Sequence, residues 1–285
     1  MFEIEALYDD TTHTLTYLVW DPSSRDAVVI DPVMDFDPIA VRTSSESVER
    51  VAELIESKGL TLRGVLDTHA HADHLSGMAL LKERYACESA VGSAFPKVQG
   101  LFKGLMGLDH LAEDGSQFDH LLDDGEELSF GSVAVKAIHT PGHTPACTSF
   151  LIGDALFTGD SMFMPDFGTG RCDFPAGSAE DLFDSVTRKL YTLPPETRVF
   201  VGHDYQPGGR ELRYETTIGD SMRENIQLRG DTNREEFVTW RSERDATLKL
   251  PKLIFQSVQV NANAGVLPPP NEAGVSVLKV PMNAL

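Results

Sequence analysis

The 285-residue sequence predicts an α/β protein, in which both strands and helices build the fold. Apolar runs with β-branched and aromatic side chains predict strands, and segments with near-helical apolar spacing predict helices between them. A histidine or an aspartate follows several of these strands directly. The chain shows no internal repeat or low-complexity run, and its hydrophobic content of 41% is ordinary for a globular protein.

The charge balance excludes one class of partner. The chain carries 24 lysines and arginines against 44 aspartates and glutamates, a formal net charge of -20. A protein that binds a polyanion needs a concentrated cationic face, so we expect no nucleic-acid partner. Screening limits the field of distant surface charges to ~8 Å at physiological salt, so a few local arginines can still attract an anionic small molecule.

The N-terminal residues and the cysteines bear on the compartment. The first ten residues contain no basic region followed by a long apolar run, and no stretch reaches the ~18 apolar residues that a membrane span needs. The cysteines Cys87, Cys147 and Cys172 are odd in number and lack paired metal-binding spacing, which favours free thiols over a disulfide framework. We therefore expect a soluble protein of the cytoplasm without membrane contact.

The N-terminal part predicts a hairpin and a helix. Residues 12–20 and 26–30 carry alternating apolar and β-branched side chains around a proline-containing break, so they predict two paired strands. We expect the acidic stretch that follows, residues 33–42, to be irregular. The run Thr43-Ser44-Ser45-Glu46 offers a capping box for a helix that ends at Gly59.

The next strand, residues 62–68, leads into the densest group of polar side chains. Directly after it, three histidines and one aspartate fall within six positions, and a helical pattern begins at Leu75. Short side chains on such a strand-to-helix loop can converge on one point, and imidazole with carboxylate suits zinc, iron or manganese. The sequence therefore predicts a metal site that draws on His69, His71, Asp73 and His74.

Three further strands each end in one candidate ligand. The strand predicted at 133–138 leads to Pro141-Gly142, which predicts a type II turn that presents His143. The other two strands are predicted at 155–158 and 198–201. They end in Asp160 and His203.

The later part of the chain predicts helices and an irregular end. Ser178 can cap a helix that runs to about Tyr191. We expect residues 210–229 and 233–247 to be mostly helical, with a possible strand at 253–260. We divide the chain into a catalytic domain, residues 1–250, and a C-terminal extension packed on the same domain, residues 251–285.

Seven candidate ligands with nitrogen and oxygen donors thus follow four strands, enough for two adjacent metals bridged by one carboxylate. The order His-x-His-x-Asp-His, then Gly-His, Gly-Asp and Gly-His, resembles the metallo-β-lactamase superfamily over about residues 10–205. The resemblance implies an αββα sandwich, in which two mixed β-sheets pack face to face, flanked by helices, with the metal at one edge.

Three other segments resemble one branch of that superfamily, the persulfide dioxygenases, also called sulfur dioxygenases. These segments are Gly170-Arg171-Cys172-Asp173-Phe174, His203-Asp204-Tyr205 and Ile30-Asp31-Pro32-Val33. The resemblance implies oxidation of glutathione persulfide with O₂ and water to sulfite and glutathione, a reaction of sulfur metabolism and sulfide detoxification. It also implies one Fe²⁺ per chain, with zinc as the alternative metal, bound by His69, His143 and Asp160.

The resemblance assigns further roles around the metal. Arg171 matches the substrate-contacting arginine of the branch and can bind a glutathione carboxylate through two N–H groups, or it pairs with Asp173 instead. Tyr205 is a second candidate substrate contact. Where the branch has threonine, this chain has Cys172. The residues left for outer hydrogen bonds or a vestigial second metal site are His71, Asp73, His74 and His203.

Two alternative functions stay open. A glyoxalase II-like thioesterase would use all seven ligands around two metals to hydrolyse an S-acylglutathione, although such enzymes usually carry Gly-Arg/Lys-x-Phe-Glu-Gly where this chain has Gly-Arg-Cys-Asp-Phe. His71 would then be a ligand, whereas we favour an outer role for it. A non-enzymatic module with a structural metal fits less well, because four ligands would close such a site. A homodimer is the candidate assembly.

Overall fold

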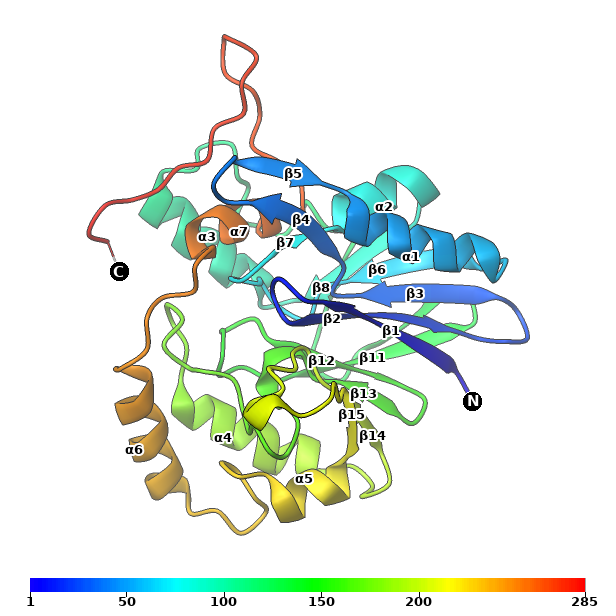
Figure 1. The fold of residues 1–285 in the computed structure, drawn as a ribbon, viewed down its shortest axis with the longest axis vertical. Helices are drawn as coiled ribbons and strands as arrows, with labels where there is room; N and C mark the ends of the chain where they lie inside the picture. Colours follow the sequence, from blue (N-terminus) through cyan, green and yellow to red (C-terminus); the bar gives the residue numbers. More distant parts are fainter. Residues whose placement is uncertain (285) are drawn as a thin grey trace.

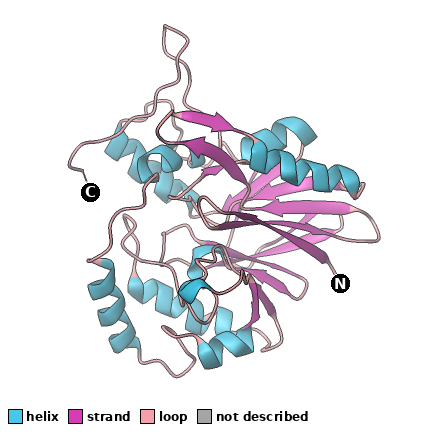
Figure 2. Ribbon diagram, in the orientation of Figure 1, coloured by secondary structure: helices cyan, strands magenta, loops and turns pink. Residues whose placement is uncertain are grey.

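The computed structural model describes residues 1–284, in which two β-sheets pack face to face between helices (Figure 1). Figure 2 shows the strands in the middle of the molecule and helices on both outer sides. The first sheet has the strand order β1-β2-β3-β6-β8-β9, and the second has the order β10-β11-β12-β13-β14-β15. Both sheets mix parallel and antiparallel pairs. The predicted αββα sandwich is confirmed.

The elements have the following bounds. The first sheet contains β1 (Glu3–Asp9), β2 (Thr14–Trp20), β3 (Asp26–Ile30), β6 (Thr61–Leu66), β8 (Glu88–Gly92) and β9 (His120–Leu122). The second contains β10 (Glu127–Phe130), β11 (Val133–His139), β12 (Thr148–Ile152), β13 (Ala155–Phe157), β14 (Arg198–Phe200) and β15 (Glu215–Thr217). A small third sheet joins β5 (Arg42–Ser44), β4 (Val33–Asp37) and β7 (Leu75–Ser76).

The helices divide between the two outer sides (Figure 1). Those on the side of the first sheet are α1 (Glu46–Ser57), α2 (Met78–Tyr85), α3 (Phe95–Met106) and α7 (Ile254–Asn261). Those on the side of the second sheet are α4 (Ala179–Arg188), α5 (Ile218–Glu224) and α6 (Arg234–Asp245). No helix of residues 1–284 is both long and apolar enough to cross a membrane.

The alternation along β2 shows how one strand serves two cores. Tyr17 and Val19 belong to the cluster between the two sheets, whereas Leu18 and Trp20 belong to the cluster beneath the helices of the first sheet. Successive side chains of a strand point to opposite faces, so in a sheet that is covered on both faces every position of an inner strand is buried. All seven residues of β2 are buried accordingly.

The structure corrects several predictions from the sequence. Residues 33–42, expected to be irregular, contain β4 and the first residue of β5. Residues 210–229, expected to be mostly helical, contain the strand β15 and the short helix α5. The segment 253–260, expected as a possible strand, forms α7, because Ile254 and Val258 bury one helical face in the core of the first sheet. The helix expected from Leu75 begins only at Met78, because β7 precedes it.

A further difference concerns the start of α1. Ser45 is the N-cap residue, but its side chain makes no capping hydrogen bond. Asp35 of β4 takes that part instead, since its carboxylate accepts hydrogen bonds from the Ser47 backbone N–H and from the Ser47 hydroxyl, both at 2.8 Å. The helix start is therefore fixed by a neighbouring strand rather than by the capping box that the sequence offers.

Candidate metal centre

Three predicted ligands form one buried group at the edge of the sandwich. The structure brings together one donor atom each from His69, His143 and Asp160, all within 4.8 Å of one another. His143 Nε2 lies 3.6 Å from Asp160 Oδ2, and the rings of His69 and His143 are 5.1 Å apart. We call these residues the first ligand group. Its members follow β6, β11 and β13, so three strand ends converge there.

Hydrogen bonds around His69 fix its tautomer. The Thr68 hydroxyl donates its proton to Asp31 Oδ2 at 2.9 Å, so toward His69 Nδ1, 3.0 Å away, it can only accept. The proton of the neutral imidazole is therefore on Nδ1, and Nε2 carries the lone pair. Burial lowers the pKa of His69 well below its ordinary value, which keeps the ring neutral.

His143 has the same tautomer as His69, and a different loop fixes it. Its Nδ1 lies 2.6 Å from the carbonyl oxygen of Arg171, which can only accept, so Nδ1 donates and Nε2 is free to bind a metal. The preceding Gly142 has φ 148°, far from the ~80° of a type II turn, so that detail of the prediction is wrong. A Cβ at Gly142 would lie 2.4 Å from Leu182 Cα, so only glycine lets α4 pack on this turn.

Unpaired buried atoms show that the first ligand group suits a cation. Within residues 1–284, His69 Nε2 and Asp160 Oδ1 are buried without a hydrogen-bond partner. Asp160 Oδ1 does lie 3.3 Å from His203 Nε2, but not in hydrogen-bonding geometry. Buried polar atoms are normally paired, and a bound divalent metal would satisfy both of these at once.

His71, Asp73 and His74 form a second ligand group, also within 4.8 Å of one another. His74 donates from Nδ1 to the Leu75 carbonyl at 3.0 Å, so its buried Nε2 is free. Burial lowers the pKa of His74 to about 4, with the neighbouring His71 acting in the same direction. Asp73 instead accepts a hydrogen bond from Thr14 Oγ1 at 3.1 Å.

His71 differs from the other histidines in what its Nε2 contacts. That atom lies 3.0 Å from Asp31 Oδ1, with both side chains almost fully buried. Burial disfavours a charge on the imidazole, but the Asp31 carboxylate outweighs it and raises the pKa of His71 to about 9. In this arrangement Asp31 occupies Nε2 of His71, whereas the buried Nδ1 of the same ring has no hydrogen-bond partner within residues 1–284.

His203 lies between the two ligand groups. Its Nδ1 donates to the His13 carbonyl at 3.2 Å, and its Nε2 is 3.3 Å from Asp160 and 3.6 Å from Asp73. Burial opposes protonation, while these two carboxylates raise the pKa of His203 above its ordinary value. The Tyr205 ring stacks on His203, with ring centroids 5.5 Å apart. His203 can therefore either pair with Asp160 or, when neutral, turn Nε2 to a second metal.

Residues 9–203 match the family model described as the metallo-beta-lactamase superfamily, which spans more than half of the chain. The chain belongs to the metallo-β-lactamase superfamily. Within that superfamily it is 44% identical to a probable metallo-hydrolase of Burkholderia pseudomallei, with 99% of both chains covered. It is 41% identical to Glyoxylase B2 of Dictyostelium discoideum, over 99% of this chain and 98% of that one.

Persulfide dioxygenases are also among its superfamily homologues. The chain is 32% identical to the human mitochondrial persulfide dioxygenase ETHE1, over 93% of this chain and 90% of the human protein. The crystal structure of ETHE1 from Myxococcus xanthus matches with a TM-score of 0.75 and 34% identity, over 93% of this chain and 100% of that chain. The predicted relationship to this branch is thus confirmed, while the names of other homologues point to hydrolysis.

Arg171 is placed beside the first ligand group of this superfamily site, but it is already paired. Its Nε and Nη2 both donate to the Asp173 carboxylate, and its Nη1 donates to the Lys249 carbonyl at 2.8 Å. A guanidinium has five N–H groups, so two are left. A narrow pocket adjoins it, lined by Ala72, His143, Arg171, Asp173, Phe174, Leu250, Pro251 and Ile254.

Tyr205, the second predicted substrate contact, is 40% exposed and lies on an aromatic wall beside His203. Its ring is 4.8 Å from that of Phe167 and 5.5 Å from that of His13. Although the side chain is partly exposed, desolvation by the surrounding side chains raises the pKa of the Tyr205 hydroxyl, with Asp160 and Asp73 adding to the effect, so the phenol stays neutral. Tyr205 therefore borders the second ligand group rather than the pocket beside Arg171.

Two residues shape the site without having been predicted as members of it. Asp31 also accepts from the Thr68 backbone N–H at 2.7 Å, so one carboxylate holds both Thr68 and His71. Its position directly after β3 repeats the pattern of the other strand ends and could have identified it. Asn261 of α7 donates to the carbonyls of His71 and His74, both at 2.9 Å, and accepts from the Ser76 N–H at 2.7 Å. No sequence pattern signals that contact.

Proposed function

We propose that this protein is a non-haem iron persulfide dioxygenase. One Fe²⁺ per chain would be bound by His69, His143 and Asp160. The reaction would convert glutathione persulfide, O₂ and water into glutathione and sulfite. The outer sulfur of the persulfide would lose four electrons, which O₂ would accept. Water would supply the third oxygen of sulfite, and the S–S bond would break to release glutathione.

The observation that carries the proposal is the first ligand group itself, in which donor atoms of His69, His143 and Asp160 lie within 4.8 Å of one another. His71 lies in the second group, so the first group offers two histidines and one carboxylate. That set is typical of iron oxygenases, because it leaves open coordination positions. When bound, Fe²⁺ would supply those positions for the persulfide sulfur and O₂. The 32% identity to human persulfide dioxygenase ETHE1 supports the same reaction.

The protein's own residues would orient the ligands and the substrate. Thr68 and the Arg171 carbonyl hold the Nδ1 protons of His69 and His143, so both rings offer Nε2. A carboxylate of the substrate would bind the two N–H groups of Arg171 that Asp173 and Lys249 leave free, or would displace Asp173. A local cation suits an anionic thiol compound in a chain with a net charge of -20. Tyr205 would contact the substrate from the other side.

We also propose the organisation and location expected from the sequence. Residues 1–250 would form the catalytic domain, and residues 251–285 an extension of it, in line with the contacts of Asn261. The cytoplasm would suit the three free thiols Cys87, Cys147 and Cys172.

Metal analysis and oxygen uptake together test the function. Protein purified without added metal should contain close to one iron per chain, should consume O₂ when given glutathione persulfide, and should release sulfite. Two tightly bound zincs per chain, hydrolysis of a glutathione thioester and no oxygen uptake would refute the proposal.

One observation favours a second candidate, a dinuclear thioesterase of the glyoxalase II type. His203 lies 3.3 Å from Asp160, which could bridge two metals, and 3.6 Å from Asp73 of the second ligand group. In that group, His74 Nε2 is unpaired among the described residues. The homologues named as a probable metallo-hydrolase and Glyoxylase B2 agree with it. Hydrolysis of S-lactoylglutathione with a zinc content of two per chain would establish this function instead.

A further inference from the structure

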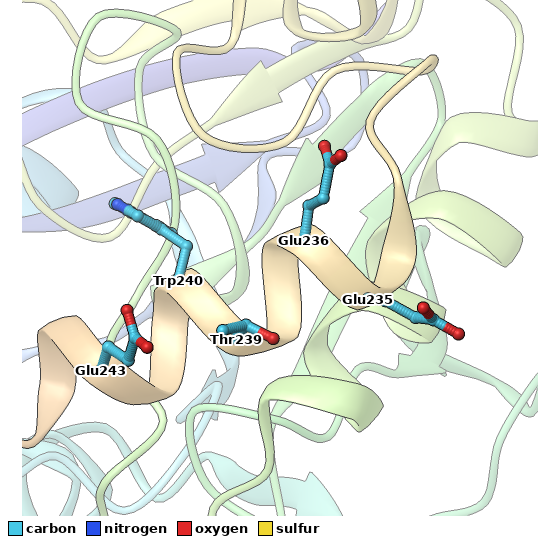
Figure 3. A pocket seen from close by; sticks show the side chains of 5 residues that line it. All are labelled: Glu235, Glu236, Thr239, Trp240 and Glu243. Atoms are coloured by element: carbon cyan, nitrogen blue, oxygen red, sulfur yellow. The ribbon is translucent and has the colours of Figure 1, made fainter.

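The helix α6 has two faces of different character. Its outer face borders a shallow hollow lined by acidic side chains and one tryptophan (Figure 3). Its inner face carries Arg241 and Asp245, which are only 2% and 3% exposed. Arg241 Nη2 donates to Asp245 Oδ1, so a buried ion pair lies one helical turn apart on the same helix. The proposed reaction makes no use of this pair.

This ion pair needs a reason other than stability. Removing two charges from water costs several kcal/mol each, and apolar residues of similar volume are often as stable or more so. Within residues 1–284, Arg241 Nε has no hydrogen-bond partner, so the burial is not fully compensated. The Trp240 ring lies 4.9 Å from the guanidinium, and this weak cation–π contact offsets part of the lost hydration.

The contacts of the pair identify what it holds. Asp245 Oδ2 accepts a hydrogen bond from the backbone N–H of Cys172 at 2.7 Å. Arg241 Nη1 donates to the carbonyl oxygen of Gly170 at 3.4 Å and to Gln227 Oε1 at 3.2 Å. The two charged groups thus bind the peptide units on either side of Arg171. No other charged side chain of the described residues bonds to these two peptide units.

The segment held in this way contacts two members of the first ligand group. The Arg171 carbonyl accepts from His143 Nδ1 at 2.6 Å, and the Gly170 N–H donates to the Asp160 carbonyl at 3.1 Å. A shift of the Gly170–Cys172 backbone would therefore turn the His143 ring and move its Nε2. The same shift would move the Arg171 guanidinium, whose Nη1 is anchored on the Lys249 carbonyl beyond α6.

We infer that Arg241 and Asp245 are positioning residues for the metal ligand His143 and for Arg171. The ion pair holds the peptide units that flank Arg171, and the Arg171 carbonyl in turn holds the imidazole proton of His143. Outer hydrogen-bond partners of this kind orient a ligand and strengthen its bond to the metal. The inference rests on the proposed function only in that His143 binds the metal.

The test distinguishes the effect of the hydrogen bond between the Cys172 N–H and Asp245 from the effect of the two charges of the ion pair. Arg241→Met with Asp245→Leu replaces the pair by apolar side chains of similar volume and removes the acceptor. Arg241→Met with Asp245→Asn also removes both charges but keeps an oxygen that can accept from the Cys172 N–H. Co²⁺ alone is titrated into each metal-free protein, with folding checked by circular dichroism and thermal unfolding.

The Met/Leu variant should remain folded and bind Co²⁺ about 10- to 100-fold more weakly than the parent, the range typical for loss of an outer partner. The Met/Asn variant should recover to within about threefold of the parent, because its amide restores the bond. Should the Met/Leu variant not fold, Arg241→Met with Asp245→Ser takes its place, since the shorter serine cannot reach the Cys172 N–H.

Two controls distinguish the possible failures. Arg229→Ala removes an exposed arginine that pairs with Asp231, and it should leave the Co²⁺ affinity unchanged. His143→Ala should lose most of it. If His143→Ala keeps the parent affinity, the proposed metal site itself is wrong. If His143→Ala loses the metal while both α6 variants keep parent affinity, the pair is only structural and the inference is overturned.

Discussion

The two ligand groups contain the same residue types at the same edge of the sandwich, but their outer atoms have different partners. In the first group, His69 and His143 each use Nδ1 for a hydrogen bond to an oxygen and keep Nε2 for the shared centre. In the second group, Nε2 of His71 is bonded to Asp31, and Nδ1 of that ring is buried without a hydrogen-bond partner among the described residues. Residue type and spacing decide which side chains can reach a metal, whereas the outer partners decide which of them are free to bind it.

The two groups also depend on different parts of the chain. The first group is held by the loops that follow β6, β11 and β13 and by the segment around Arg171. The second group is held from the N-terminal hairpin, through Thr14, and from α7, through Asn261. Substitutions can therefore weaken one group and spare the other, which allows the comparison to be tested.

The largest expected effect follows from removing the carboxylate of Asp160, which lies between His143 and His203. Asp160→Ala takes away the only carboxylate of the first group and should abolish iron binding, whereas His203→Ala should leave substantial iron in place. Iron per chain, measured on proteins purified in parallel, checks both. Equal metal loss in the two variants would mean that the groups act together as a dinuclear site.

The next effect concerns Arg171, which borders the first group only. Arg171→Ala should raise KM for glutathione persulfide more than it lowers iron content. Loss of one charge-assisted pair costs about 1.5–3 kcal/mol, or roughly tenfold to a hundredfold in kcat/KM. Arg171→Lys should recover part of this, because a point charge cannot reproduce the planar guanidinium fork. An alanine variant with normal iron and unchanged kcat/KM would make Arg171 a structural partner of Asp173.

A smaller effect should come from His71. His71→Asn keeps a donor for Asp31 while removing the imidazole, so iron binding should change by less than about threefold if His71 is an outer residue. Chelator competition on the purified variant measures this. A loss of tenfold or more, together with a lost second metal, would place His71 among the ligands and break the distinction between the groups.

The smallest effect is expected at the cysteines, which should add no thiolate to either group. Burial raises the pKa of Cys87 to about 11 and that of Cys147 to about 12, and it raises the pKa of Cys172 as well. A raised thiol pKa leaves the neutral, unreactive form in excess at all lower pH values. The folded protein should therefore resist alkylation at pH 8 and react at three positions after unfolding, as counted by mass spectrometry.

Most of this site could be predicted because its members obey a local rule. His69, His143, Asp160 and His203 each lie a few positions after the end of a strand, and strand ends meet at one edge of a sheet. The hydrogen bond of His71 Nε2 could not be predicted, because its partner Asp31 lies 40 positions away in the sequence. The helix α7 was taken for a possible strand because eight residues rich in valine and glutamine have no decisive period until their tertiary neighbours are known.

The contact of Asn261 with the metal loop bears on how the protein is made. Its partner His71 lies 190 positions earlier in the chain, so the loop that carries the second ligand group is completed by a segment that is synthesised much later than the loop itself. All seven candidate ligands are synthesised before that segment. Contacts between residues so far apart in sequence form late, because closing the long intervening loop costs conformational entropy before the contact can stabilise the chain. A growing chain can therefore meet metal ions with its histidines exposed and its loop unclamped, so the fidelity of metal choice depends on the order of folding and metal capture.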